Sequence, residues 1–143
     1  MEKKEIGFVG MGRMGLNMVT NLIEKGYRVV GIDPNTDAQG LARDGGVEVV
    51  SDYQALVSAL AVPRVVWIMV PSSLVDTVLA DLLPLLETGD TIIDGGNSFY
   101  QDSIRRHQEV NARGLSFLDC GTSGGMQGAR HGAAIMVGGE QGV

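Results

Sequence analysis

The chain has 143 residues, 44% of them hydrophobic and 20% charged, and a formal net charge of -6. These values predict one globular domain and argue against a broad nucleic-acid surface, because phosphate backbones are bound by clustered Lys and Arg. The sequence shows no membrane-spanning run, no secretory signal pattern, a single cysteine (Cys120) and two distant histidines, so we expect a cytoplasmic protein with no membrane partner, no disulfide and no metal site.

Short β-branched runs alternate with segments of helical periodicity along the chain. The pattern predicts strands at residues 6–9, 27–32, 47–50, 64–70, 91–94 and 115–119, and helices at 15–26, up to residue 41, and at 51–60, 73–86 and 98–113. Ser51 with Gln54 resembles a capping box, and Gly26 and Gly114 fall where helices should end. The predicted fold class is α/β, with a doubly wound, mainly parallel Rossmann-type sheet and helices on both faces.

The first strand is followed by GMGRMG, in which Gly10, Gly12 and Gly15 match the G-x-G-x-x-G pattern. The first glycine permits a tight turn, the second lets a pyrophosphate approach the backbone, and the third lets the helix pack on the strand. Because the pattern lies between a strand and a helix, it predicts a dinucleotide site. A glycine-rich turn without a ligand is the alternative.

The second strand ends at Asp33. In dinucleotide-binding folds an acidic residue ~20 residues after the glycine turn binds the adenosine ribose, and Asp33 lies close to that spacing. Asp33 followed by Pro34 is also a good helix N-cap pair. Neither Pro34 nor Asn35 is an arginine that could receive a 2′-phosphate, which favours NAD over NADP.

The fourth predicted strand ends in MVPSS. Pro71 should stop the strand, and Ser72 or Ser73 can cap the next helix.

The fifth strand ends in DGGNS, where Gly95 and Gly96 bring backbone close to a neighbour and Asn97 offers both a donor and an acceptor. Ser98, with Gln101, fits a helix cap. We therefore expect Asn97 to contact a ligand. A helix cap at Asn97 is the alternative.

The stretch DCGTSGGMQGARHG, residues 119–132, follows the sixth strand, and a strand-like AAIMVGG comes after it. Ser123, Gly124 and Gly125 would present a hydroxyl and unhindered amides beside Asn97, which suits a small polar acid. We expect a substrate-binding loop here. A mobile glycine loop is the alternative.

GFVGMGRMG, MVP, DGGNS and FLDCGTSGGMQGARHGAAIMVGG together resemble the β-hydroxyacid dehydrogenase superfamily, most closely the NAD-linked 6-phosphogluconate dehydrogenase family. The resemblance runs from about Lys4 to Glu140. In NADP-linked members Asn-Arg-Thr stands in place of Asp33, Pro34 and Asn35, so the resemblance also implies NAD. It further implies sets of binding residues. For the cofactor these are Gly10, Met11, Gly12, Arg13, Met14, Gly15, Asp33, Pro34, Asn35, Val70, Pro71, Ser72 and Asn97; for the substrate they are Asn97, Ser123, Gly124 and Gly125.

The resemblance implies oxidation of the C3 hydroxyl of 6-phosphogluconate by hydride transfer, loss of carbon dioxide and protonation of an enediol to ribulose 5-phosphate. The implied lysine and glutamate acid-base pair lies beyond the position of Val143, on an all-helical domain that also forms a homodimer. We therefore expect no catalytic residue in this chain and a cofactor domain cut near its C-terminal end.

Arg105, Arg106 and His107 are interpreted as the solvated face of a helix, His131 as structural or at the rim of the site, and Cys120 as a small buried residue. Two other functions stay open. One is a dehydrogenase for another β-hydroxyacid, of the 3-hydroxyisobutyrate or tartronate semialdehyde type. The other is a non-catalytic NAD-sensing module.

Overall fold

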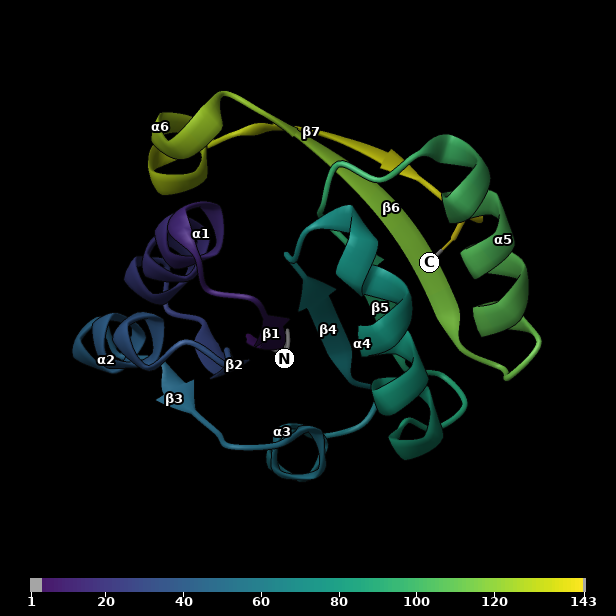
Figure 1. The fold of residues 1–143 in the computed structure, drawn as a ribbon, viewed down its shortest axis with the longest axis horizontal. Helices are drawn as coiled ribbons and strands as arrows, with labels where there is room; N and C mark the ends of the chain where they lie inside the picture. Colours follow the sequence, from purple (N-terminus) through teal and green to yellow (C-terminus); the bar gives the residue numbers. More distant parts are fainter. Residues whose placement is uncertain (1–3, 143) are drawn as a thin grey trace.

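A computed structural model describes residues 4–142, which fold into seven strands, six α-helices and two 3-10 turns (Figure 1). The strands are β1 (Glu5–Val9), β2 (Arg28–Ile32), β3 (Glu48–Val49), β4 (Val65–Ile68), β5 (Thr91–Asp94), β6 (Ser116–Ser123) and β7 (Ala134–Gly138). The helices are α1 (Arg13–Glu24), α2 (Thr36–Asp44), α3 (Tyr53–Ala59), α4 (Val75–Leu82), α5 (Tyr100–Asn111) and α6 (Gly125–His131). The 3-10 turns are η1 (Ser72–Leu74) and η2 (Leu83–Leu85).

The strands form one sheet in the order β3-β2-β1-β4-β5-β6-β7. The first six are parallel, and β7 pairs antiparallel to β6. The strand order reverses between β1 and β4, and the carboxyl ends of strands at such a point are where open α/β sheets bind ligands.

Helices cover both faces of the sheet (Figure 1). One buried cluster packs α3, α4 and α5 against the sheet and includes Leu56, Leu79 and Val110. The other packs α1 and α2 against the opposite face and includes Val19 and Ala42. Because both faces are covered, the central strands are apolar on both sides, as in parallel sheets generally. The predicted α/β, doubly wound fold is confirmed.

The glycine-rich stretch differs most from its prediction. Strand β6 continues to Ser123 rather than ending at Asp119, and Gly125 and Gly128 belong to the short helix α6 rather than to a loop, with Gly124 and Gly132 at its two ends. Ala129 of α6 is buried, and the ion pair between Arg130 and Glu24 joins α6 to α1. Contacts with α1 therefore order a segment whose sequence has little intrinsic preference for helix.

The predicted helix caps are partly wrong. Asp52, not Ser51, caps α3 by accepting a hydrogen bond from the backbone N of Ala55 at 2.7 Å. No side chain caps η1 or α5, so Ser72 and Ser98 do not cap these elements. The glycine stops are confirmed, because Gly26 and Gly114 follow α1 and α5 with φ of +87° and +76°.

No helix within residues 4–142 is long and apolar enough to cross a membrane.

Candidate functional site

The turn after β1 is shaped by two close backbone contacts. Gly10 has a φ of +94°, and a Cβ there would collide with the carbonyl of Met69 at the end of β4. A Cβ on Gly15 would collide with the carbonyl of Gly10. A Cβ on Gly12, in contrast, would point into open space. The turn is thus closed on the sheet side and open where a phosphate would approach.

The first turn of α1 presents backbone rather than side chains to this space. Gly12 is the N-cap residue, and no side chain caps the helix. Arg13 is exposed, Met14 is partly buried, and the Met11 side chain is buried in the core. Amide N–H groups at a helix N-terminus favour negatively charged groups such as phosphate.

Asp33 lies directly after β2 and faces the glycine turn. Its Oδ2 accepts a hydrogen bond from the backbone N of Met11 at 2.7 Å, and its Oδ1 accepts one from the backbone N of Asn35 at 2.8 Å. Each carboxylate oxygen can accept a further bond. The alternative interpretation of Asp33 as a helix cap is wrong. Asn35 caps α2, by accepting from the backbone N of Asp37 and Ala38.

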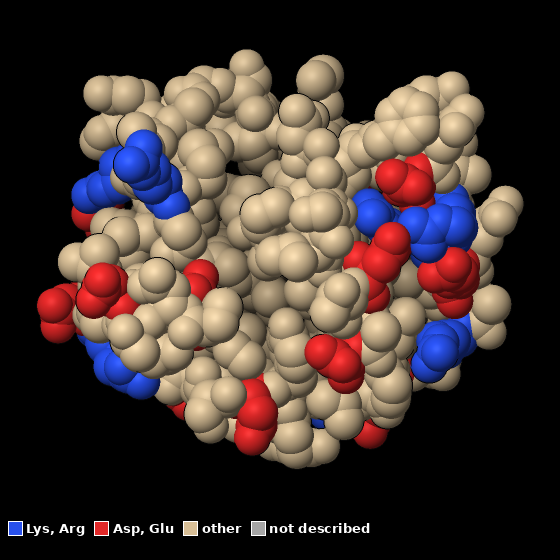
Figure 2. Space-filling view, viewed as in Figure 1, with Lys and Arg blue, Asp and Glu red and all other residues tan. Residues whose placement is uncertain are grey.

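A first cavity of about 730 Å³ opens at the carboxyl ends of β1, β2 and β4. The described residues that line it include no Lys and no Arg; they are Val9, Gly10, Gly12, Ile32, Asp33, Pro34, Gln39, Ser51, Tyr53, Met69, Val70, Pro71, Leu74, Thr77 and Val78. In the space-filling view the middle of the face is mainly uncharged, and Lys and Arg lie toward its margins (Figure 2).

A second cavity, of about 480 Å³, adjoins the first, and both are lined by Met69 and Val70. It brings together Asn97 and Ser123, which the sequence analysis assigned to one site. Its lining residues are Met14, Met69, Val70, Gly95, Gly96, Asn97, Gly121, Thr122, Ser123 and Met136, and none of these has an ionisable side chain. The second cavity can donate and accept hydrogen bonds, but its own residues cannot exchange a proton near neutral pH.

The remaining predicted site residues lie beside the cavities. Gly124 and Gly125 are exposed and directly follow Ser123 at the start of α6. Ser72 follows Pro71, which lines the first cavity, and Asn35 follows Pro34, which lines it as well. All the predicted positions are therefore at one edge of the sheet.

Four residues that line the second cavity, Met69, Gly121, Thr122 and Met136, were not among the binding residues expected from the sequence. Gly121 and Thr122 belong to the part of β6 beyond Asp119, where the predicted strand ended too early. The Thr122 hydroxyl is buried and has no hydrogen-bond partner within the described residues.

The prediction that Arg106 belongs to a solvated helix face is wrong. The side chain of Arg106 is 2% exposed, and its Nε donates to Asp76 Oδ1 at 2.9 Å. The hydrogen bond from Arg106, with a second from Arg105, lowers the pKa of Asp76 to about 2. The spacing of Ser103, Arg106 and Val110 on one helical face could have indicated this burial.

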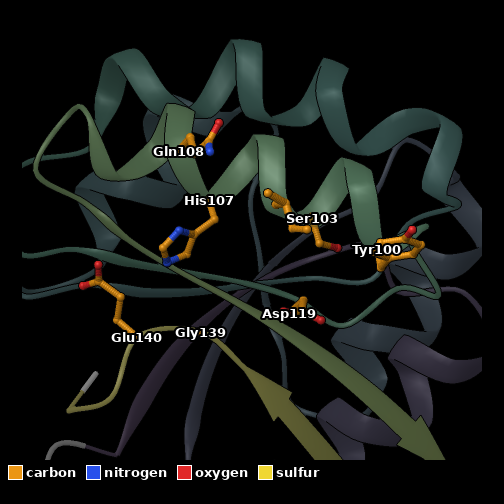
Figure 3. A pocket seen from close by; sticks show the side chains of 8 residues that line it. Tyr100, Ser103, His107, Gln108, Asp119, Gly139 and Glu140 are labelled. Carbon is orange, nitrogen blue, oxygen red and sulfur yellow. The ribbon is translucent and has the colours of Figure 1, made fainter.

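A third cavity, of about 360 Å³, lies between α5, β6 and the segment after β7 (Figure 3). Tyr100, Ser103 and His107 from α5, with Asp119 and Glu140, project toward it. It shares none of its lining residues with the first or second cavity. His107 thus lies outside the cavity that Asn97 and Ser123 line.

Cys120 is buried as expected, and burial raises the pKa of its thiol. Among the described residues, no group of three or more His, Cys, Asp or Glu side chains is placed to hold a metal ion.

Comparison with known proteins finds similarity to domains of dehydrogenases. The family model described as the NAD binding domain of 6-phosphogluconate dehydrogenase matches residues 5–143. The NAD(+)-dependent, decarboxylating 6-phosphogluconate dehydrogenase of Haloferax volcanii is 41% identical over 138 residues, which cover 96% of this chain and 45% of that protein.

Two solved structures are similar in fold and sequence. The Plasmodium falciparum 6-phosphogluconate dehydrogenase, described in apo form and with NADP+ and 6-phosphogluconate, has a TM-score of 0.88 and 30% identity, over 96% of this chain and 31% of that one. The Mycobacterium tuberculosis 3-hydroxyisobutyrate dehydrogenase with L-serine has a TM-score of 0.90 and 30% identity, over 98% of this chain and 48% of that one. The chain spans less than half the length of the curated relatives it matches.

Proposed function

The chain belongs to the family of 6-phosphogluconate dehydrogenase NAD-binding domains, and from that premise we propose that it binds NAD and holds 6-phosphogluconate against it for oxidative decarboxylation. The observation that carries the proposal is the junction of the two cavities at Met69 and Val70. A dinucleotide in the first cavity would bring its nicotinamide to this junction, and a sugar acid in the second cavity would meet it there.

The glycine turn and Asp33 fit the adenosine and pyrophosphate part of the cofactor. The open space beside Gly12 leaves room for the pyrophosphate, and the helix N-terminus favours its charge. Asp33 is held beside the turn and can accept hydrogen bonds from ribose hydroxyls. A 2′-phosphate would meet this carboxylate, and no Lys or Arg among the described residues lines the cavity. We therefore assign NAD rather than NADP.

The second cavity fits a polyhydroxy acid. Asn97 can donate to and accept from neighbouring hydroxyl groups, and Ser123 adds a hydroxyl. The backbone amides of Gly124 and Gly125 lie next to it and suit a carboxylate. Met14, Met69 and Val70 supply an apolar wall to this cavity.

Bound NAD supplies the hydride acceptor. Removal of the hydroxyl proton needs a base, and the described residues that line the second cavity offer none. We assign the base and acid to a helical domain outside the matched region, as the family resemblance implies. The chain is then the cofactor domain of a longer enzyme, which we expect to be cytoplasmic and homo-oligomeric.

A second candidate is oxidation of a shorter β-hydroxyacid. The structural likeness to the 3-hydroxyisobutyrate dehydrogenase, with a TM-score of 0.90, favours it. Asn97 and its glycines argue for the sugar acid instead, because an amide offers two polar groups to a substrate with several hydroxyls.

Calorimetric titration of the chain with NADH and NADPH tests the cofactor assignment. We expect saturable binding of NADH, weaker binding of NADPH, and no NADH formation when NAD and 6-phosphogluconate are added together. Failure of NADH to bind would refute the proposal, and steady turnover would show that a base lies within the chain.

A further inference from the structure

Arg106 of α5 is a buried cation outside the cavities described above. It is among the largest fully buried side chains and lines neither the first nor the second cavity. A buried charge is costly unless partners compensate it. The identity of those partners indicates what the residue does.

The guanidinium of Arg106 connects three segments. Its Nε donates to Asp76 Oδ1 of α4 at 2.9 Å, and its Nη1 donates to Ser98 Oγ, in the loop between β5 and α5, at 3.1 Å. Its Nη2 donates to the carbonyl of Ser72 at 3.5 Å. The last two partners directly follow Asn97 and Pro71, which line the second and first cavities.

Asp94 extends this network under the Asn97 loop. Its buried carboxylate accepts from the backbone N of Gly96 at 3.0 Å and from Ser98 Oγ at 2.5 Å, and Arg106 Nη1 lies 3.6 Å from its Oδ2. Bonds to Gly96 and Ser98 fix the backbone on both sides of Asn97. Gly95 is confined too, since a Cβ there would collide with the Trp67 indole.

We propose that Arg106 is a positioning residue that holds the Asn97 and Pro71 loops at the junction of the two cavities, and thereby sets the affinity for the nicotinamide half of the cofactor. This inference rests on the proposed function. Arginine suits the task because its planar guanidinium offers five donors in a fixed fork, whereas a lysine ammonium cannot span the same partners.

The test compares Arg106→Lys with Arg105→Lys in the chain. Arg105 is the adjacent residue and also bonds Asp76, but it is 44% exposed and its other ion-pair partners are Asp102 and Glu109 of its own helix. NADH and ADP-ribose are titrated into each variant. ADP-ribose serves as the probe because it lacks the nicotinamide that the proposal places at the junction.

We expect Arg106→Lys to weaken NADH binding about tenfold, as for one lost hydrogen bond to a charged group. ADP-ribose affinity should stay within about twofold, as should both affinities in Arg105→Lys. Parallel losses for NADH and ADP-ribose in Arg106→Lys would reduce Arg106 to a general structural role. Unchanged NADH affinity would overturn the inference as well.

Hydrogen exchange in the ligand-free chain separates this inference from the proposed function. Amide exchange at residues 72–75 and 95–99 should increase in Arg106→Lys, not in Arg105→Lys, whether or not NADH binds the unmodified chain. Unchanged exchange in these loops contradicts the inference. If Arg106→Lys fails to fold, Ser98→Ala removes the hydrogen bonds by which Ser98 bridges Arg106 and Asp94 while keeping the buried charge. It should change the same loops and the same affinity ratio.

Discussion

Asp33 shows how one side chain can organise a turn and line a cavity at the same time. The carboxylate accepts bonds from the backbone N of Met11 and of Asn35, so it is fixed against the glycine turn before any cofactor arrives. The spacing in the sequence predicted its position. Its bond to Met11 could not be predicted, because it joins residues 22 apart through the packing of β1 beside β2.

Asp33→Asn should weaken NADH binding about tenfold, because it removes a charged acceptor. It should also narrow the preference over NADPH, since the carboxylate no longer repels a 2′-phosphate. Calorimetric titration with both cofactors measures the ratio. Asp37→Asn, an exposed carboxylate in the first turn of α2, is the matched control. An unaltered NADH to NADPH ratio in Asp33→Asn would rule out Asp33 as the source of selectivity.

At the scale of elements, an ion-pair network joins α4 to α5. Asp76 of α4 lies 2.9 Å from both Arg105 and Arg106 of α5. These two helices carry the loops that form the walls of the cavities, so their alignment affects the site. The sequence showed both helices but not the pairing between them, which depends on side chains about thirty residues apart.

Acid should weaken the ion pairs between Asp76 and the two arginines in a defined pH range. The pKa of Asp76 falls from 3.8 to about 2 in the folded chain, chiefly through the hydrogen bond from Arg106. Because the folded pKa is the lower one, its contribution is complete above about pH 4 and is lost as the pH falls through about 2. The side chain is 53% exposed, so solvent screening limits the contribution to below about 1 kcal/mol.

Urea unfolding of Asp76→Asn at pH values above and below this range tests the point. Above this pH range the variant should have a lower free energy of unfolding than the unmodified chain. Below the range the two free energies should be closer. Asp81→Asn, an exposed carboxylate on the same helix, should show no such convergence. A constant difference across the range would mean that the Asp76 charge does not stabilise the fold.

Strand β7 lies at an open edge of the sheet. Within the described residues it pairs only with β6, and Ile135, Met136 and Val137 are all exposed. Edge strands that lack charge or proline promote pairing with another chain. The chain should therefore self-associate as its concentration rises.

Val137→Lys should reduce this self-association, because it places a charge on the open edge. Leu41→Lys replaces a similarly exposed apolar residue on α2 and should leave the association unchanged. Sedimentation velocity over a range of concentrations measures both. A monomeric unmodified chain at high concentration would show that the β7 edge is not adhesive.

For the whole molecule, the sequence predicts the parallel part of the sheet well, because apolar periodicity and glycine stops are local signals. It misses helix α6, whose glycines disfavour helix and which packs against α1. It misplaces Arg106, since burial of a charge depends on partners from other elements. The proximity of Asn97 and Ser123 could be predicted, although the two residues lie at the ends of different strands. The reason is that the carboxyl ends of parallel strands lie at the same edge of the sheet.

The central claim is that the two cavities form one site, with the dinucleotide in the first and a sugar acid in the second. Backbone amide chemical shifts of the chain, saturated with NAD and titrated with 6-phosphogluconate, test it most directly. We expect shifts concentrated at Asn97 and at Ser123 to Gly125, and smaller shifts with 3-hydroxyisobutyrate. Absent shifts with both acids, or shifts confined to the third cavity around His107, would contradict it.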